Sequence, residues 1–174
     1  MKSYFSTLCA LALIITLSFF TQGCNSINSA GNVKSVEPAQ ITEAGLSWYK
    51  IDDLENMGSI GNKKVLIDVY TDWCGWCKVM DKKTFTNPAL VEYLNENYVL
   101  VKFNAEQKEP LSFMGEEYEW MNVGRRGVNK LALKLLNGRL GYPTLVYLDE
   151  NFNTIKASPG YKTPDQLMGE LQVL

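Results

Sequence analysis

Short runs of hydrophobic residues alternate along this chain with segments whose apolar residues follow helical spacing. The runs lie at residues 46–49, 65–70, 98–103 and 144–148. Short apolar runs bounded by polar or turn-forming residues are typical of buried β-strands. Residues 154–157 follow the last run after a polar loop and predict a partner strand, so the sheet is expected to end in a hairpin.

Helices are expected between these strands, at residues 51–57, 74–83, 87–97 and 129–136 and again after residue 163. Asn87 can cap the third helix with Pro88 at its first position. Thr163 begins a Thr-Pro-Asp-Gln capping box at the start of the last helix. Strands that alternate with helices and end in a hairpin predict an α/β fold, with a central mixed sheet flanked by helices on both faces.

Residues 106–128 interrupt this pattern and form an insertion. The alternating pairs Leu111/Phe113 and Tyr118/Trp120 predict an added hairpin within it. Two interpretations are equally supported: the insertion is a lip that faces a substrate, or it is a decoration that covers a sheet edge.

The chain starts with a segment that is typical of export signals. Lys2 supplies a positive charge, and residues 8–20 form an apolar run that is short for a membrane span. The run closes in Thr-Gln-Gly before Cys24, which resembles a bacterial lipoprotein signal in which this cysteine is lipidated. We therefore expect a signal peptide at 1–23 and a lipid at Cys24, with an ordinary secretory signal or an uncleaved anchor as alternatives.

The segment after Cys24 is rich in Ser, Asn and Gly and has no apolar periodicity. Such a composition is typical of a tether. The expected organisation is a flexible tether at 24–45 and one domain at 46–174, which is long enough to bury a hydrophobic core.

Composition excludes some partners. The 174 residues carry 17 basic and 19 acidic side chains, for a formal net charge of −2, and loss of the signal peptide would make the chain slightly more negative. A mildly acidic chain does not indicate a nucleic-acid partner or an acidic membrane surface.

The four cysteines separate into two groups. Cys9 and Cys24 belong to the leader and its end, so only Cys74 and Cys77 remain in the domain, and the chain has no histidine. A structural zinc site needs about four Cys or His ligands, so no metal is expected. A Cys-x-x-Cys ring restrains little chain entropy. The pair is therefore better explained by thiol reactivity than by stabilisation of the fold through a disulfide. A position at a helix N-terminus would favour the thiolate form of a cysteine.

Four features together resemble the thioredoxin-like family over about residues 46–174. They are Trp73-Cys74-Gly75-Trp76-Cys77-Lys78, Asp68 in the preceding strand, Lys102 in the next strand, and Gly141-Tyr142-Pro143-Thr144 before a later strand. Trp76 stands where thioredoxins proper carry proline, as in secreted bacterial thioredoxin-like proteins with non-proline residues between the cysteines. The resemblance implies a thioredoxin fold with an insertion before a cis-proline loop. It also implies a redox-active Cys74–Cys77 disulfide with no other cofactor.

The resemblance assigns roles to the reactive groups. Cys74, nearer the helix start and expected to be more exposed, would attack a disulfide, and Cys77 would resolve the mixed disulfide. Asp68 would accept the proton of Cys77. The alternatives are two inert buried thiols and an aspartate that faces solvent at a strand edge. Lys102 either pairs with Asp68 and tunes its pKa or is a solvated lysine.

Other residues are expected to contact the substrate. A cis bond before Pro143 would leave the Tyr142 backbone free to pair with an extended substrate, whereas a trans proline on an edge strand is the alternative. Trp73 and Trp76 would form an apolar rim, although Trp76 could instead pack on its own helix.

These residues predict a thiol–disulfide oxidoreductase that reduces disulfides of exported proteins. By resemblance, it would sit in the cell envelope, lipid-anchored and facing the periplasm, and would draw electrons from a membrane thiol donor. The alternatives are an oxidase or isomerase of the same fold, and a binding module whose cysteine pair is structural.

Overall fold

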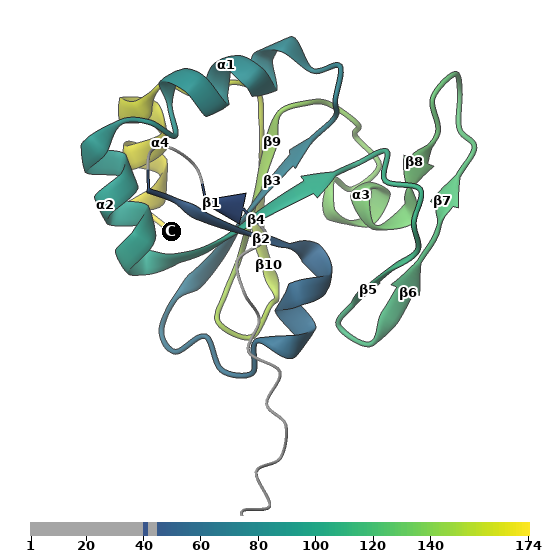
Figure 1. The fold of residues 1–174 in the computed structure, drawn as a ribbon, viewed down its shortest axis with the longest axis horizontal. Coiled ribbons are helices and arrows are strands. Elements are labelled where there is room, and N and C mark those ends of the chain that lie inside the picture. Colours follow the sequence, from purple (N-terminus) through teal and green to yellow (C-terminus); the bar gives the residue numbers. More distant parts are fainter. Residues whose placement is uncertain (1–39, 42–44) are drawn as a thin grey trace, which may run out of the picture. The chain divides into compact units, whose positions relative to one another are not determined.

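A single mixed sheet organises the fold (Figure 1). Its strands are β1 (Gln40–Ile41), β2 (Ser47–Lys50), β3 (Lys64–Tyr70), β4 (Tyr98–Asn104), β9 (Thr144–Leu148) and β10 (Thr154–Pro159). The six lie in the order β1-β2-β4-β3-β9-β10. β2, β4 and β3 are mutually parallel, while β9, β10 and β1 each run antiparallel to their neighbours. The predicted mixed sheet and its closing hairpin are confirmed.

The computed structural model describes residues 40–41 and 45–174, all within one compact unit, Lys34–Leu174. The signal peptide predicted at 1–23, Cys24 and the tether to residue 39 lie outside the described residues. One correction concerns the end of that tether, because Gln40–Ile41 forms β1 and pairs with β2. Among the helices in the described part of the chain, none is long and apolar enough to cross a bilayer.

Helices cover both faces of the sheet. They are α1 (Gly75–Lys83), α2 (Pro88–Asn97), α3 (Lys130–Leu135), α4 (Pro164–Leu171) and the 3-10 helix η1 (Ile51–Asn56). The predicted N-cap residues of α2 and α4 cap their helices as expected. The Asn87 side chain accepts a hydrogen bond from Leu90 N, and Thr163 forms a capping box with Gln166. Because these caps satisfy backbone N–H groups that have no partner inside the helix, both helices begin where the sequence predicts.

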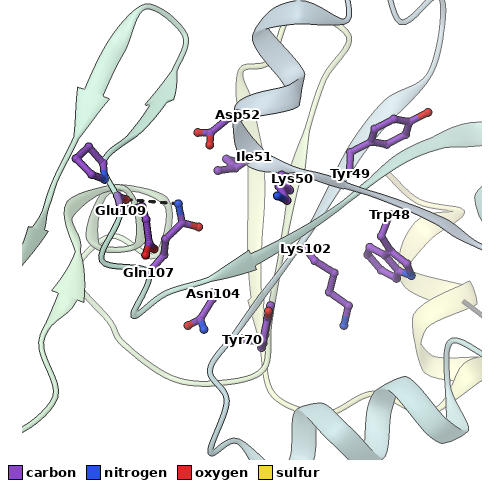
Figure 2. Close-up of a pocket in the computed structure, with 11 residues that line it drawn as sticks. Trp48, Tyr49, Lys50, Ile51, Asp52, Tyr70, Lys102, Asn104, Gln107 and Glu109 are labelled. Atoms are coloured by element: carbon purple, nitrogen blue, oxygen red, sulfur yellow. Dashed lines mark hydrogen bonds between the residues drawn. The ribbon is translucent and has the colours of Figure 1, made fainter. Parts of the chain in front are cut away.

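Alternation along β3 decides which side chains reach which face. Leu66 packs with Met80 of α1 and the residues of α2 and α4, and Asp68 follows it two positions later on the same side of the strand. Lys102 of β4 is the direct neighbour of Asp68 across the parallel ladder. Figure 2 shows the Lys102 side chain between Trp48 and Tyr70, and its Nζ lies 4.9 Å and 5.4 Å from the centroids of these two rings.

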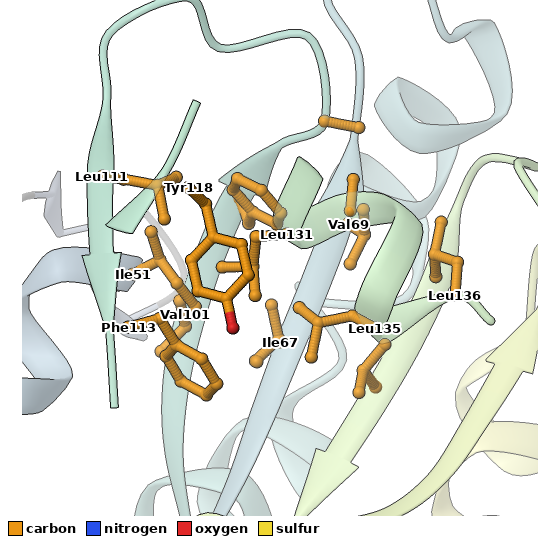
Figure 3. Packing of buried hydrophobic residues seen from close by; sticks show 14 of the residues in the cluster. Ile51, Ile67, Val69, Val101, Leu111, Phe113, Tyr118, Leu131, Leu135 and Leu136 are labelled. Carbon is orange, nitrogen blue, oxygen red and sulfur yellow. The ribbon is translucent and has the colours of Figure 1, made fainter. Parts of the chain in front are cut away.

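The opposite face carries a second hydrophobic core (Figure 3). Ile67 and Val69 of β3 and Val101 of β4 contribute to it from the sheet. Leu131 and Leu135 cover them from α3. The sheet is therefore buried on both sides, which explains the nearly continuous apolar character of its central strands.

The insertion contains two small antiparallel ribbons. β5 (Leu111–Phe113) pairs with β6 (Glu116–Tyr118), as the alternation predicts, and β7 (Trp120–Met121) pairs with β8 (Val128–Asn129). The two residues between β5 and β6, Met114 and Gly115, have positive φ angles of 55° and 75°. A turn with positive φ at both central residues matches the right-handed twist of a hairpin.

The first ribbon covers a face of the sheet. Leu111, Phe113 and Tyr118 are buried in the same core as Ile67 and Val101 (Figure 3). The strands at the two edges of the sheet are β1 and β10. The interpretation of this hairpin as a cover for a sheet edge was therefore wrong, because its apolar side chains pack against a face of the sheet, in the same buried core as the residues of α3.

Candidate active site

The two cysteines lie at the start of α1 and form a disulfide. The S–S distance is 2.04 Å and the Cα–Cα distance is 5.3 Å. Cys74 is the N-cap residue, and its Sγ accepts a hydrogen bond from the Cys77 N–H at 3.1 Å. A sulfur in this position receives both a backbone donor and the positive end of the helix dipole.

The disulfide form buries both sulfur-bearing residues. Cys74 is 4% exposed and Cys77 is 2% exposed. The expected difference in exposure is therefore small in this state, and the assignment of Cys74 as the attacking thiol rests on its place at the helix terminus.

Asp68 is completely buried and paired. Its Oδ2 lies 2.5 Å from Lys102 Nζ, and its side chain is 0% exposed. The alternative of a solvent-facing strand-edge aspartate was wrong, and so was that of an unpaired, solvated Lys102. The other carboxylate oxygen, Oδ1, has no hydrogen-bond partner among the residues described. Because a buried acceptor without a partner is costly, this oxygen can readily take up a proton.

Asp81 of α1 is a further member of the cluster that the sequence analysis missed. Lys102 Nζ donates to Asp81 Oδ1 as well as to Asp68. Asp81 lies four residues after Cys77, so both residues belong to one face of α1. That spacing was a signal in the sequence, but an aspartate on a polar helix is ordinary without knowledge of the lysine opposite.

Burial and neighbouring charges shift the pKa of Asp68 and that of Lys102. Burial raises the pKa of Asp68 above its ordinary value, and the nearby Lys102 charge opposes this shift without cancelling it. Burial acts to lower the pKa of Lys102, but the Asp68 and Asp81 charges outweigh it and the pKa is raised. Lys102 therefore stays charged, while Asp68 is a carboxyl group with increased proton affinity.

A groove of about 530 Å³ leads to this cluster from solvent (Figure 2). Lys102, Trp48 and Tyr70 line it together with Gln107 and Glu109 from the start of the insertion. The Lys102 side chain is 21% exposed, whereas that of Asp68 is fully buried. The groove can therefore bring water to the lysine that pairs with the buried acid.

The cis-proline loop lies where the resemblance predicts. The Tyr142–Pro143 bond is cis, so the alternative of a trans proline was wrong. The Tyr142 ring makes an edge-on contact with Trp73, with 6.0 Å between the ring centroids. Since Trp73 directly precedes Cys74, this contact brings the loop next to the redox motif.

Trp76 packs against a neighbouring loop. Its ring centroid lies 5.4 Å from that of Tyr161, and the residue is 62% exposed. The two rings line an apolar hollow of about 390 Å³ with Tyr142, Pro143 and Gly160. Trp76 is therefore available on the surface beside the cysteines.

The loop that carries Tyr161 is held by hydrogen bonds from a buried lysine, Lys162. Lys162 Nζ donates to the carbonyl oxygens of Ser158, Pro159 and Gly160 at 3.3 to 3.4 Å. The Gly160 N–H donates to the Pro143 carbonyl at 2.8 Å. A backbone hydrogen bond thus connects Gly160 and Pro143, which both line the apolar hollow.

The insertion reaches the redox motif through Trp73. The indole Nε1 donates to Glu106 Oε1 at 2.9 Å, and the Arg126 guanidinium lies 5.0 Å from the Trp73 ring centroid. Arg125 and Arg126 line a second hollow of about 400 Å³ with Trp73 and Tyr142. The sequence analysis did not identify these arginines as site residues.

This architecture is a thioredoxin fold with a disulfide at the start of its first long helix. Residues 52–173 match the Thioredoxin-like domain. The chain belongs to the thioredoxin-like family.

Sequence relatives agree with this assignment, and a solved structure agrees with the fold. The chain is 28% identical over 142 residues to the thiol:disulfide interchange protein DsbD of Haemophilus ducreyi, covering 78% of this chain and 22% of the relative. It is 27% identical to the DsbD of Pectobacterium atrosepticum, covering 92% of this chain and 28% of the relative. A solution structure of a thioredoxin from Thermus thermophilus has a TM-score of 0.53 at 14% identity, covering 74% of this chain and 85% of that one.

The chain spans less than a third of the length of these two DsbD relatives. The family, these relatives and the disulfide-bonded Cys74–Cys77 pair support thiol–disulfide oxidoreductase chemistry in general. The expected roles of individual site residues stay predictions.

Proposed function

We propose that this protein reduces disulfides of exported proteins through the Cys74/Cys77 dithiol. The observation that carries the proposal is the position of the cysteine pair at the start of α1, where each cysteine directly follows an exposed tryptophan, beside the Tyr142–Pro143 loop. A reactive dithiol next to apolar side chains can capture a protein disulfide and hold its flanking residues. The chemistry needs no cofactor beyond the two sulfurs.

The reaction starts from the reduced protein. The Cys74 thiolate attacks one sulfur of a substrate disulfide, which forms a mixed disulfide and releases one substrate thiolate. The Cys77 thiol then loses its proton and attacks Cys74 Sγ. This step releases the second substrate thiol and forms the Cys74–Cys77 disulfide, so two electrons pass to the substrate.

Asp68 is the proposed proton acceptor for Cys77. Full burial, a raised pKa and an oxygen without a described partner support a carboxylate that accepts a proton readily. A general base works best when its pKa lies near the working pH, and burial moves Asp68 in that direction. Lys102 and Asp81 would hold its orientation from β4 and α1.

Several parts of the proposal extend beyond the domain. The relatives named thiol:disulfide interchange proteins favour a thiol donor in the membrane that reduces Cys74–Cys77 after each turnover. The leader favours an envelope location facing the periplasm, with a lipid on Cys24. A Cys24→Ser variant should then move from the membrane fraction to the soluble fraction while its domain stays active, and membrane retention would contradict the lipid anchor.

The reductase activity can be tested by insulin reduction. With dithiothreitol as the electron source, the wild-type protein should accelerate insulin precipitation, and the Cys74→Ser variant should not. Equal rates for the two would exclude catalysis by this pair and favour a binding module. Measurement of the Cys74/Cys77 reduction potential would separate a reductase from an oxidase or isomerase, because known potentials of such pairs span about 150 mV.

A further inference from the structure

The redox motif has two different hollows beside it, and they share one residue. Trp76, Tyr161 and Pro143 line the apolar hollow, while Arg125 and Arg126 line the second one with Trp73. Tyr142 belongs to both. Since Trp73 directly precedes Cys74 and Trp76 directly precedes Cys77, each hollow is lined by a residue next to one of the two cysteines.

The second hollow has an excess of positive charge. Neither Arg125 nor Arg126 forms an ion pair with any carboxylate in the described part of the chain. Glu106 also lines this hollow, but its Oε1 already accepts the Trp73 indole hydrogen bond. The hollow therefore presents two guanidinium groups against one carboxylate.

The arginines are held in place by the second ribbon of the insertion. The Gly127 N–H donates to the Val123 carbonyl at 3.0 Å and closes the turn that carries both arginines. Gly127 has a φ of 74°, and a Cβ there would lie 2.0 Å from Trp120 Cζ2. Arg126 itself stacks on Trp73. A turn constrained on both sides presents its charges in a defined position, which lowers the entropy lost on binding.

We infer that this turn selects substrates by charge: the preferred protein disulfide has an acidic side chain beside the attacked cysteine and an apolar side chain on its other side. Arg125 and Arg126 receive the acidic group, and Trp76 and Tyr161 receive the apolar one. Arginine suits this role because its planar guanidinium binds carboxylates through paired hydrogen bonds. The inference rests on the proposed reductase function and adds the class of substrate.

Matched peptides test this selectivity directly. Each peptide is closed by one internal disulfide with a leucine on one side of the attacked cysteine, and the residue on the other side is Glu, Gln or Lys. The full-length, pre-reduced protein is mixed with each peptide, and the second-order rate constant of disulfide reduction is measured in a single turnover. At low ionic strength we expect the Glu peptide to react about 2- to 5-fold faster than the Gln peptide, the range for an exposed ion pair, and the Lys peptide to react slower than both.

Variants identify the groups responsible. Arg125→Gln and Arg126→Gln should each reduce the ratio of the Glu-peptide rate constant to the Gln-peptide rate constant, and the double variant should bring this ratio to about one. Arg139→Gln is the matched control, because Arg139 is exposed and lies outside the hollow, and it should keep the full preference. Added salt should reduce the preference of the wild type.

The outcomes separate this inference from the proposed function. Equal rates with the Glu and Gln peptides, or a Glu preference that survives in the double variant, would overturn the charge selectivity and leave the reductase proposal standing. A pre-reduced protein that reduces none of the peptides would overturn both.

Discussion

Lys102 Nζ lies 2.5 Å from Asp68 Oδ2 and at the same time donates to Asp81, so that one ammonium group joins β4, β3 and α1. The three elements meet because Asp68 and Lys102 are register partners in the parallel ladder. A buried acid is thereby linked to the helix that carries Cys77. Because a buried carboxylate is costly, we interpret its presence as functional rather than stabilising.

This interpretation predicts the effect of Asp68→Asn on stability. In the folded protein the pKa of Asp68 is raised by burial, so between the unfolded and folded pKa values the folded state binds more protons than the unfolded one. The wild type therefore loses stability as the pH rises through this window, by at most about 1.4 kcal/mol per pH unit because one proton is involved. Asn cannot ionise and avoids this loss.

The measurement is denaturant unfolding of the oxidised proteins, in which the cysteines do not titrate. The stability of Asp68→Asn relative to wild type should increase as the pH is raised above about 4, the ordinary aspartate pKa. A difference that stays constant above this pH would show that Asp68 does not change its protonation in the window that burial implies.

The same variant should separate the two half-reactions. Formation of the mixed disulfide needs only the Cys74 thiolate, whereas its resolution needs the proton of Cys77 to leave. Asp68→Asn should therefore slow substrate release by about 10²-fold or more, the contribution usual for a general base, with a smaller effect on mixed-disulfide formation. Quenched-flow trapping of the intermediate measures both steps, and unchanged rates in both would reduce Asp68 to a packing residue.

In the reduced protein, Cys74 should be alkylated before Cys77 at near-neutral pH. Cys74 caps α1 and its sulfur faces the Cys77 N–H, which favours the thiolate. Mass mapping after brief treatment with iodoacetamide reports the order. Earlier modification of Cys77 would reverse the assignment of the attacking and resolving thiols.

Trp76→Ala should impair the reduction of protein disulfides but not reactions with small disulfides. Trp76 is largely exposed and contacts Tyr161 at the rim of the apolar hollow, so it contributes docking surface rather than core packing. Burial of an aromatic side chain is worth about 1.5 to 3 kcal/mol, so a loss of about 10-fold or more in kcat/KM for insulin is expected. A small disulfide such as dithionitrobenzoate is the control, and an equal loss with both substrates would indicate that Trp76 acts on the cysteines instead.

Gly127→Ala should destabilise the second ribbon of the insertion. The new Cβ would lie 2.0 Å from Trp120 Cζ2 and 2.8 Å from the Met121 carbonyl oxygen, and the backbone has a positive φ. We expect a loss of about 1 to 3 kcal/mol in the free energy of unfolding, from overpacking and strain. Gly124→Ala is the matched control, since φ is 63° there but no atom lies within 4 Å of the new Cβ.

The two glycine variants differ mainly in this collision. Thermal unfolding should therefore show a clearly larger loss for Gly127→Ala than for Gly124→Ala. Similar losses would mean that positive φ alone, and not the approach to Trp120, requires glycine at position 127.

Some elements of the fold could be predicted from the sequence, and others could not. The helix starts at Pro88 and Pro164 follow from the residues directly before them, because a cap acts within one turn. β1, by contrast, is only two residues long and exists through its pairing with β2. A strand this short has no periodicity to detect, so the tether was expected to continue through it. In the insertion, the Tyr118/Trp120 alternation predicted one strand, but Tyr118 lies in β6 and Trp120 in β7, which pairs with β8.

By itself, the sequence determined the order of strands and helices, the caps, the cysteine motif and the positions of Asp68, Lys102 and Pro143. The caps and the cysteine motif depend on neighbouring residues, whereas Asp68, Lys102 and Pro143 follow from the resemblance of their order and spacing to the family. Only the tertiary structure decided that Lys102 joins Asp68 to Asp81, and that Arg126 lies over Trp73. Such contacts join residues far apart in sequence, and they form because packing of the sheet, α1 and the insertion brings these side chains together.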